Sequence, residues 1–104
     1  MVARAENKML NNLKSIGLKT DDRCYVIAEI GINHGGSMRQ ALDLVDSAAK
    51  TGCHAVKFQT YNAEQRVPDK KDPLYDILKS CELELSSFLE LKEFSEHRGL
   101  EFFS

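Results

Sequence analysis

Apolar and polar positions along the first half of the chain predict a strand, a helix and a second strand. Residues 24–31, CYVIAEIG, are apolar and β-branched and run into a glycine, which is typical of a strand. The spacing of apolar residues then predicts a helix over Ser37–Lys50, opened by a capping box between Ser37 and Gln40 and ended by Gly52. Residues 55–60, AVKFQT, predict a strand, which completes a βαβ unit with a parallel sheet.

The second half of the chain continues the alternation of helix and strand. Residues 61–72 are polar and predict a long loop, and Pro73 suits the first turn of a short helix. A further helix is predicted to start at Ser86 or Ser87 and to run to His97, with a capping box between Ser87 and Glu90, and LEFFS at residues 100–104 begins a third strand. The expected buried positions of these two helices are Leu74, Ile77 and Leu78 in the first, and Phe88, Leu91 and Phe94 in the second.

Strands that alternate with helices predict an α/β fold, either a doubly wound sheet or a (β/α)8 barrel. A complete barrel typically needs about 250 residues, and the chain has 104. We therefore expect the N-terminal portion of a TIM barrel, incomplete, with about three parallel strands and their intervening helices. Residues 1–22 are interpreted as an N-terminal lead-in and residues 23–104 as the truncated barrel domain.

Composition narrows the classes of partner. The formal net charge is −2, from 14 basic and 16 acidic residues, which gives no reason to expect nucleic acid or a membrane surface. Apolar runs are too short to span a bilayer, and the first residues have no apolar core of the secretory kind. The three cysteines have no metal-like spacing and are expected to be reduced thiols, which favours a cytoplasmic protein.

Three polar residues interrupt the apolar strands on one face. Alternation puts Glu29 on the opposite side of the first strand from Ala28 and Ile30, and it separates Lys57 and Gln59 from Val56 and Phe58 in the second. In a barrel the three would point inward near the carboxyl-terminal mouth, where active sites of this fold lie. The open alternatives are a Glu29–Lys57 ion pair that only fills the interior, a solvent-exposed sheet face, or a site for a charged ligand.

The segments IAEIGINHGG, AVKFQTY, LYDILKSCELE and LKEFSEHRGLEFFS closely resemble the N-acetylneuraminate (sialic acid) synthase family, which includes legionaminic and pseudaminic acid synthases. The resemblance covers residues 25–104. It implies a (β/α)8 barrel that condenses phosphoenolpyruvate with N-acetylmannosamine or a related amino sugar, giving an N-acetylneuraminate-type acid and phosphate. It also implies a divalent metal, Mn²⁺ or Mg²⁺, and a homodimer for the complete family enzyme.

The resemblance assigns roles to individual residues. Glu29 would be catalytic, orienting or deprotonating the attacking water; Lys57 would bind phosphoenolpyruvate, and Gln59 the amino sugar. Asn33, His34 and Tyr61 are expected to support the site. The family's metal ligands come later in the barrel, so none is expected in this chain, and the isolated chain is expected to be inactive. Two other interpretations stay open: another phosphate-handling barrel such as an aldolase or isomerase, and a non-catalytic binding module derived from a barrel.

Overall fold

The computed structural model describes residues 24–104. The lead-in predicted for residues 1–22 lies outside the described residues. The elements follow the order β1 (Ile27–Gly31), α2 (Met38–Lys50), β2 (Ala55–Phe58), α3 (Ala63–Arg66), α4 (Pro73–Ser80), α5 (Leu85–His97) and β3 (Glu101–Phe103).

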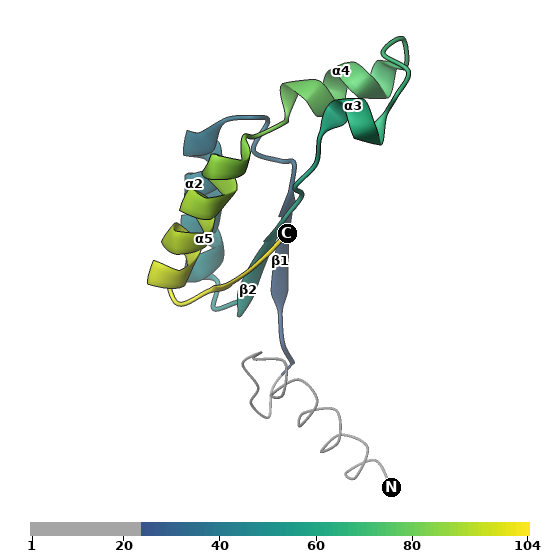
Figure 1. Ribbon diagram of the computed structural model, residues 1–104. Coiled ribbons are helices and arrows are strands. Elements are labelled where there is room, and N and C mark those ends of the chain that lie inside the picture. Colours follow the sequence, from purple (N-terminus) through teal and green to yellow (C-terminus); the bar gives the residue numbers. More distant parts are fainter. Residues whose placement is uncertain (1–23) are drawn as a thin grey trace, which may run out of the picture.

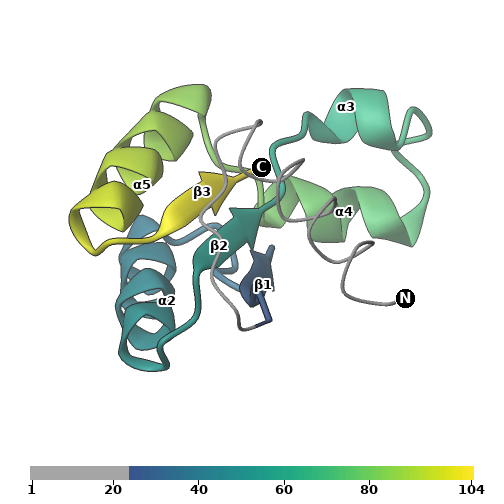
Figure 2. The same cartoon turned by 90° about the horizontal axis from the view of Figure 1, so that it is seen from below.

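The three strands form one parallel sheet in the order β1-β2-β3, as the alternating pattern predicts. Ile27 of β1 is the partner of Ala55 in β2, and Ala55 is the partner of Glu101 in β3. Both long helices, α2 and α5, cover the same face of this sheet (Figures 1 and 2). The described part is therefore a two-layer α/β unit with one covered sheet face.

The core lies between the sheet and the two long helices. Val45 of α2, Leu91 of α5 and Val56 of β2 are completely buried there. The Phe58 ring stacks on Phe102 of β3, with ring centroids 5.7 Å apart. Burial of large apolar side chains is the main stabilising contribution, about 1.5–3 kcal/mol for each of them.

The predicted start of α2 is confirmed, and the predicted start of α5 is wrong. The Ser37 hydroxyl accepts a hydrogen bond from the Gln40 backbone N–H at 3.2 Å. In α5 the helix already begins at Leu85, and the Ser87 backbone N–H donates to the Glu84 carbonyl at 2.9 Å. Ser87 therefore lies inside the first turn, so no capping box forms between it and Glu90.

The buried side of α5 follows the prediction for Phe88 and Leu91, whereas Phe94 is only half-buried. The Arg98 guanidinium lies over the Phe94 ring, 3.9 Å from its centroid, and covers its outer side. A cation over an aromatic face is favourable, by about 0.5–1 kcal/mol at an exposed site.

Residues 61–72, predicted as a loop, contain the short helix α3, which pairs with α4 as a helical hairpin. This α3–α4 hairpin projects beyond the carboxyl ends of β1 and β2 (Figure 1). Its small core consists of Ala63, Val67 and Leu78. Leu74 and Ile77, predicted to be buried in α4, are 47% and 55% exposed, because the short α4 packs on α3 through one side only.

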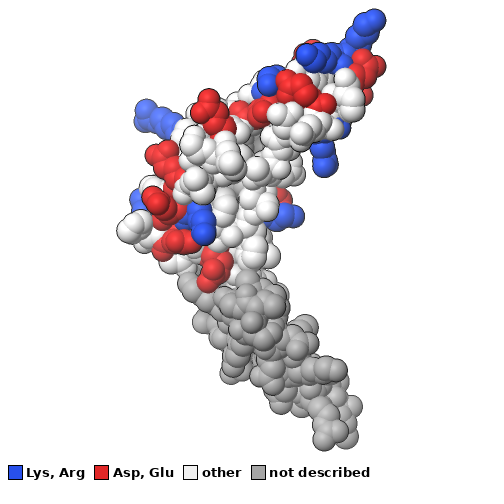
Figure 3. Space-filling view, viewed as in Figure 1, with Lys and Arg blue, Asp and Glu red and all other residues white. Residues whose placement is uncertain are grey.

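Charged side chains gather over the α3–α4 hairpin and over α2 and α5 (Figure 3). No helix within residues 24–104 is long and apolar enough to cross a membrane.

Candidate active site

Glu29 and Lys57 face each other on neighbouring strands. They are register partners in β1 and β2, and Lys57 Nζ lies 3.4 Å from Glu29 Oε2. Their side chains are 51% and 52% exposed. Val56 and Phe58, on either side of Lys57 in the strand, are buried in the core with α2 and α5, so alternation puts Lys57 on the opposite face of the sheet. The ion pair considered from the sequence is thus present, but an exposed pair of this kind stabilises a protein by only about 0–1 kcal/mol.

Gln59 completes the predicted group of three polar side chains. It follows the last residue of β2, and its side chain approaches Gly31 at the end of β1. A methyl group added at Gly31 would lie 3.3 Å from Glu29 Oε1 and 3.6 Å from Gln59 Nε2. The three side chains therefore converge at the carboxyl edge of the sheet, while their roles toward a substrate stay predictions.

Beside this edge is a cavity of about 430 Å³ that Lys57 and Gln59 line. Residues that the sequence pattern did not indicate also line it: Phe58, Thr60, Arg66, Leu74, Leu78 and Ser104. Arg66 reaches the cavity from the end of α3, the short helix that follows β2. The signal for α3 is present in the sequence, because Asn62 and Gln65 have helix-start spacing and the Asn62 side chain accepts a hydrogen bond from the Gln65 N–H at 3.2 Å.

Asn33 and His34 hold the loop that follows β1. The Asn33 side-chain amide donates to the Ile30 carbonyl at 2.9 Å, and the Gly36 N–H donates to Nδ1 of His34 at 3.0 Å. His34 is 1% exposed, and this burial lowers the pKa of its imidazole. His34 therefore acts on the loop as a neutral acceptor, and its support of a site stays a prediction.

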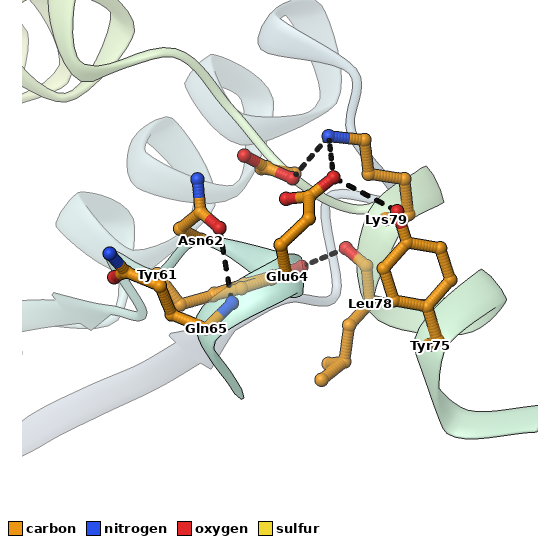
Figure 4. A network of polar contacts seen from close by, with 8 residues as sticks. Tyr61, Asn62, Glu64, Gln65, Tyr75, Leu78 and Lys79 are labelled. Carbon is orange, nitrogen blue, oxygen red and sulfur yellow. Dashed lines mark hydrogen bonds and ion pairs between the residues drawn. The ribbon is translucent and has the colours of Figure 1, made fainter. Parts of the chain in front are cut away.

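Tyr61 fastens the hairpin to the end of β2. Its hydroxyl donates a hydrogen bond to the Leu78 carbonyl in α4, as Figure 4 shows. Burial raises the pKa of this hydroxyl, and the neighbouring Cys81 and Glu82 raise it further. The hydroxyl is thus engaged in holding one wall of the cavity.

A network of charged and polar groups joins α3 to α4 (Figure 4). Lys79 Nζ lies 3.0 Å from Glu64 Oε1 and 3.2 Å from Glu82 Oε2, and the Tyr75 hydroxyl donates to Glu64 Oε1 at 2.9 Å. The hydrogen bond from Lys79, a backbone hydrogen bond and the hydrogen bond from Tyr75 together lower the pKa of Glu64 to about 2. Glu64 is therefore an ionised structural residue of the hairpin at neutral pH.

The described residues do not provide a metal centre. Between residues 24 and 104 no three His, Cys, Asp or Glu side chains come together in a way that could hold a metal ion. The three cysteines are free thiols in this part of the chain.

Comparison with known families and proteins identifies relatives. A family model described as the NeuB family matches residues 44–104. The chain is 42% identical over 80 residues to an uncharacterized protein of Methanocaldococcus jannaschii, covering 77% of this chain and 23% of that protein. It is 32% identical over 111 residues to the N,N'-diacetyllegionaminic acid synthase of Legionella pneumophila, covering 94% of this chain and 31% of the relative.

A solved structure shows the same fold. The crystal structure of the N-acetylneuraminic acid (sialic acid) synthetase from Leptospira borgpetersenii, in complex with citrate, matches with a TM-score of 0.74 and 39% identity. The match covers 79% of this chain and 28% of that one. The predicted fold class, the N-terminal portion of a (β/α)8 barrel with three parallel strands, is confirmed. The chain spans 23% to 31% of the length of these relatives, and the predicted boundary at residue 22 stays a prediction.

Proposed function

The chain belongs to the NeuB family, and from that premise we propose that it forms the donor-binding edge of a nonulosonate synthase. The proposed reaction joins phosphoenolpyruvate to N-acetylmannosamine or a related amino sugar. Its products are an N-acetylneuraminate-type acid and phosphate. The observation that carries the proposal is the convergence of Glu29, Lys57 and Gln59 at the carboxyl edge of two parallel barrel strands, beside a cavity.

The chemistry needs an anion-binding group and a carboxylate close together. The enol carbon of the donor forms a bond to the aldehyde carbon of the sugar, and the aldehyde oxygen takes up a proton. Positive charge then develops on the phosphate-bearing carbon, a water molecule adds there and loses a proton, and phosphate departs. A carboxylate at this position stabilises the developing positive charge and accepts the proton of the water, and we assign this role to Glu29.

Lys57 is proposed to bind the phosphate or carboxylate of the donor. Its pairing with Glu29 at 3.4 Å is half-exposed, so exchanging that partner for a substrate anion costs little. A charge-assisted hydrogen bond to a substrate anion is worth about 1.5–3 kcal/mol, which exceeds the worth of the exposed pair. Release of Lys57 would also free Glu29 for water.

Gln59 is proposed to bind the amino sugar, because an amide offers both a donor and an acceptor to hydroxyl and N-acetyl groups. The proposal assigns no residue of this chain to the divalent metal that the family resemblance implies, and no step passes through it. A homodimer is likewise proposed only for the complete family enzyme.

Steady-state kinetics of the full gene product test the assignment. Lys57→Ala should lower kcat/KM for phosphoenolpyruvate by more than about tenfold, because it removes a charge-assisted contact. Gln59→Ala should instead raise KM for the amino sugar.

Lys92→Ala is the matched control for the lysine variant. Lys92 also forms a half-exposed ion pair, with Glu96 at 3.9 Å, but it lies on α5, which covers the other face of the sheet. Unchanged phosphoenolpyruvate kinetics in Lys57→Ala, or an equal loss in Lys92→Ala, would remove the assignment.

A further inference from the structure

Most polar side chains that line the cavity already have partners within the protein. Lys57 pairs with Glu29, the Tyr61 hydroxyl donates to the Leu78 carbonyl, and the hydroxyls of Thr60 and Ser104 bond to each other. Within residues 24–104, the side chains of Gln59 and Arg66 have no hydrogen-bond or ion-pair partner. The cavity therefore presents one amide and one guanidinium that can bind a ligand.

Arg66 differs from the other arginines of the described part. Arg98 is bonded to Asp46, and Arg39 lies on α2 away from the cavity, whereas Arg66, which is also exposed, lines the cavity. Arg66 faces a cavity that is also lined by Leu74 and Leu78. A planar guanidinium is suited to bidentate hydrogen bonding with a phosphate or carboxylate.

We propose that Arg66 is a substrate-binding residue that takes a phosphate or carboxylate group at the hairpin end of the cavity. The inference rests on the proposed function, since it adds a second cation to the site of Lys57 and Gln59. Lys57 lies in β2, Gln59 follows the strand, and Arg66 projects from α3 beyond it. A ligand in the cavity would meet both cations and the amide.

Two sources of the anionic group fit this chemistry. One is the donor itself, whose carboxylate and phosphate are both anionic. The other is a phosphate carried by the amino sugar, because Gln59, which is proposed to bind the sugar, lines the same cavity as Arg66. Binding measurements separate the two sources.

The test is calorimetric titration of the full gene product with four probes: phosphoenolpyruvate, inorganic phosphate, N-acetylmannosamine and a phosphorylated N-acetylmannosamine. Arg66→Gln should raise Kd for at least one organic anion by about tenfold or more and leave the uncharged sugar unaffected. Arg66→Lys should recover part of the loss, because lysine keeps the positive charge but cannot form the bidentate contact of a guanidinium. Arg39→Gln is the control, with an exposed arginine outside the cavity.

The pattern of losses identifies the source. A loss for phosphoenolpyruvate assigns Arg66 to the donor, and a loss confined to the phosphorylated sugar assigns it to the acceptor. The inference is overturned if Arg66→Gln binds both organic anions like the wild type, if the wild type binds neither, or if Arg39→Gln loses as much. Lys57→Ala, titrated in parallel, tests the proposed function separately. If Lys57→Ala loses phosphoenolpyruvate binding and Arg66→Gln binds both organic anions like the wild type, the role of Arg66 is wrong and the proposed function stands.

Discussion

Gly36 lies where the loop after β1 touches the end of α4. Its φ is +81°, in the left-handed region, and a Cβ placed there would lie only 2.2 Å from the Ser80 carbonyl oxygen. That oxygen belongs to the backbone and cannot rotate away. A side chain at this position therefore requires the loop and the hairpin to separate.

Gly36→Ala should accordingly destabilise the protein by more than the cost of backbone strain. Gly52→Ala is the matched control, because Gly52 has φ +80° and a Cβ added to it would meet nothing within 4 Å. The control should lose about 1–2 kcal/mol of unfolding free energy from left-handed strain, and Gly36→Ala about 1–3 kcal/mol more from overlap. Urea unfolding measures both, and equal losses would show that the loop does not press on α4.

The geometry of an ion pair does not by itself indicate a functional role. Lys57–Glu29 and Lys92–Glu96 are both half-exposed pairs, at 3.4 Å and 3.9 Å. Only their places differ: one pair lies at the carboxyl ends of parallel strands, and the other lies along a helix. The functional proposal for Lys57 therefore depends on where the strand presents it.

At the scale of elements, the α3–α4 hairpin depends on charge as well as on its small apolar core. Glu64 accepts hydrogen bonds from Lys79 and Tyr75, and its pKa falls from 4.5 to about 2. The unfolded chain therefore binds a proton at Glu64 more readily than the folded chain does. The stability contributed by Glu64 is present in full above about pH 4.5 and is lost as the pH falls toward about 2.

Glu64→Gln should therefore weaken the hairpin at pH 6 and make little difference at about pH 2. Amide hydrogen exchange in α4 across this range measures the difference between variant and wild type. Glu90→Gln on α5 is the control, an exposed glutamate with no ion pair in the described part of the chain. A difference for Glu64→Gln that stays constant from pH 6 to pH 2 would contradict the role of ionised Glu64. High salt should reduce the effect at pH 6, because the network is partly exposed.

Elements with strong local signals could be predicted from the sequence. The strand pattern around Glu29 and Lys57 and the Ser37 cap each involve only neighbouring residues, so periodicity and capping chemistry were sufficient. The start of α5 could not be predicted in this way, because Ser86 and Ser87 resemble caps while Glu84, which caps with its backbone alone, leaves no sequence signal.

The hairpin side of the site was harder to predict. Arg66 lies at the cavity because α3 forms and packs on α4, and that contact joins segments separated by a polar stretch. The exposure of Leu74 and Ile77 has the same origin, since helical spacing identifies an apolar side but not what will cover it. Both the position of Arg66 and the exposure of Leu74 and Ile77 depend on how α3 and α4 pack together, which local sequence patterns do not specify.

For the whole molecule, the main fact is that one face of the sheet is covered and the other carries the site. Ile27 is 45% exposed, and Glu29 and Lys57 are half-exposed beside it. In a closed barrel these positions face the interior. That the chain alone cannot complete the reaction stays a prediction, based on three strands and no metal-binding group among residues 24–104.

The most direct measurement of the central claim is a map of backbone amide chemical shifts during titration of the ¹⁵N-labelled protein with phosphoenolpyruvate. We expect the largest changes at Lys57, Gln59 and Gly31, with small changes along α2 and α5. These changes should be lost in Lys57→Ala but not in Lys92→Ala. Changes concentrated on the outer helices, or no saturable change at the carboxyl edge of the sheet, would contradict it.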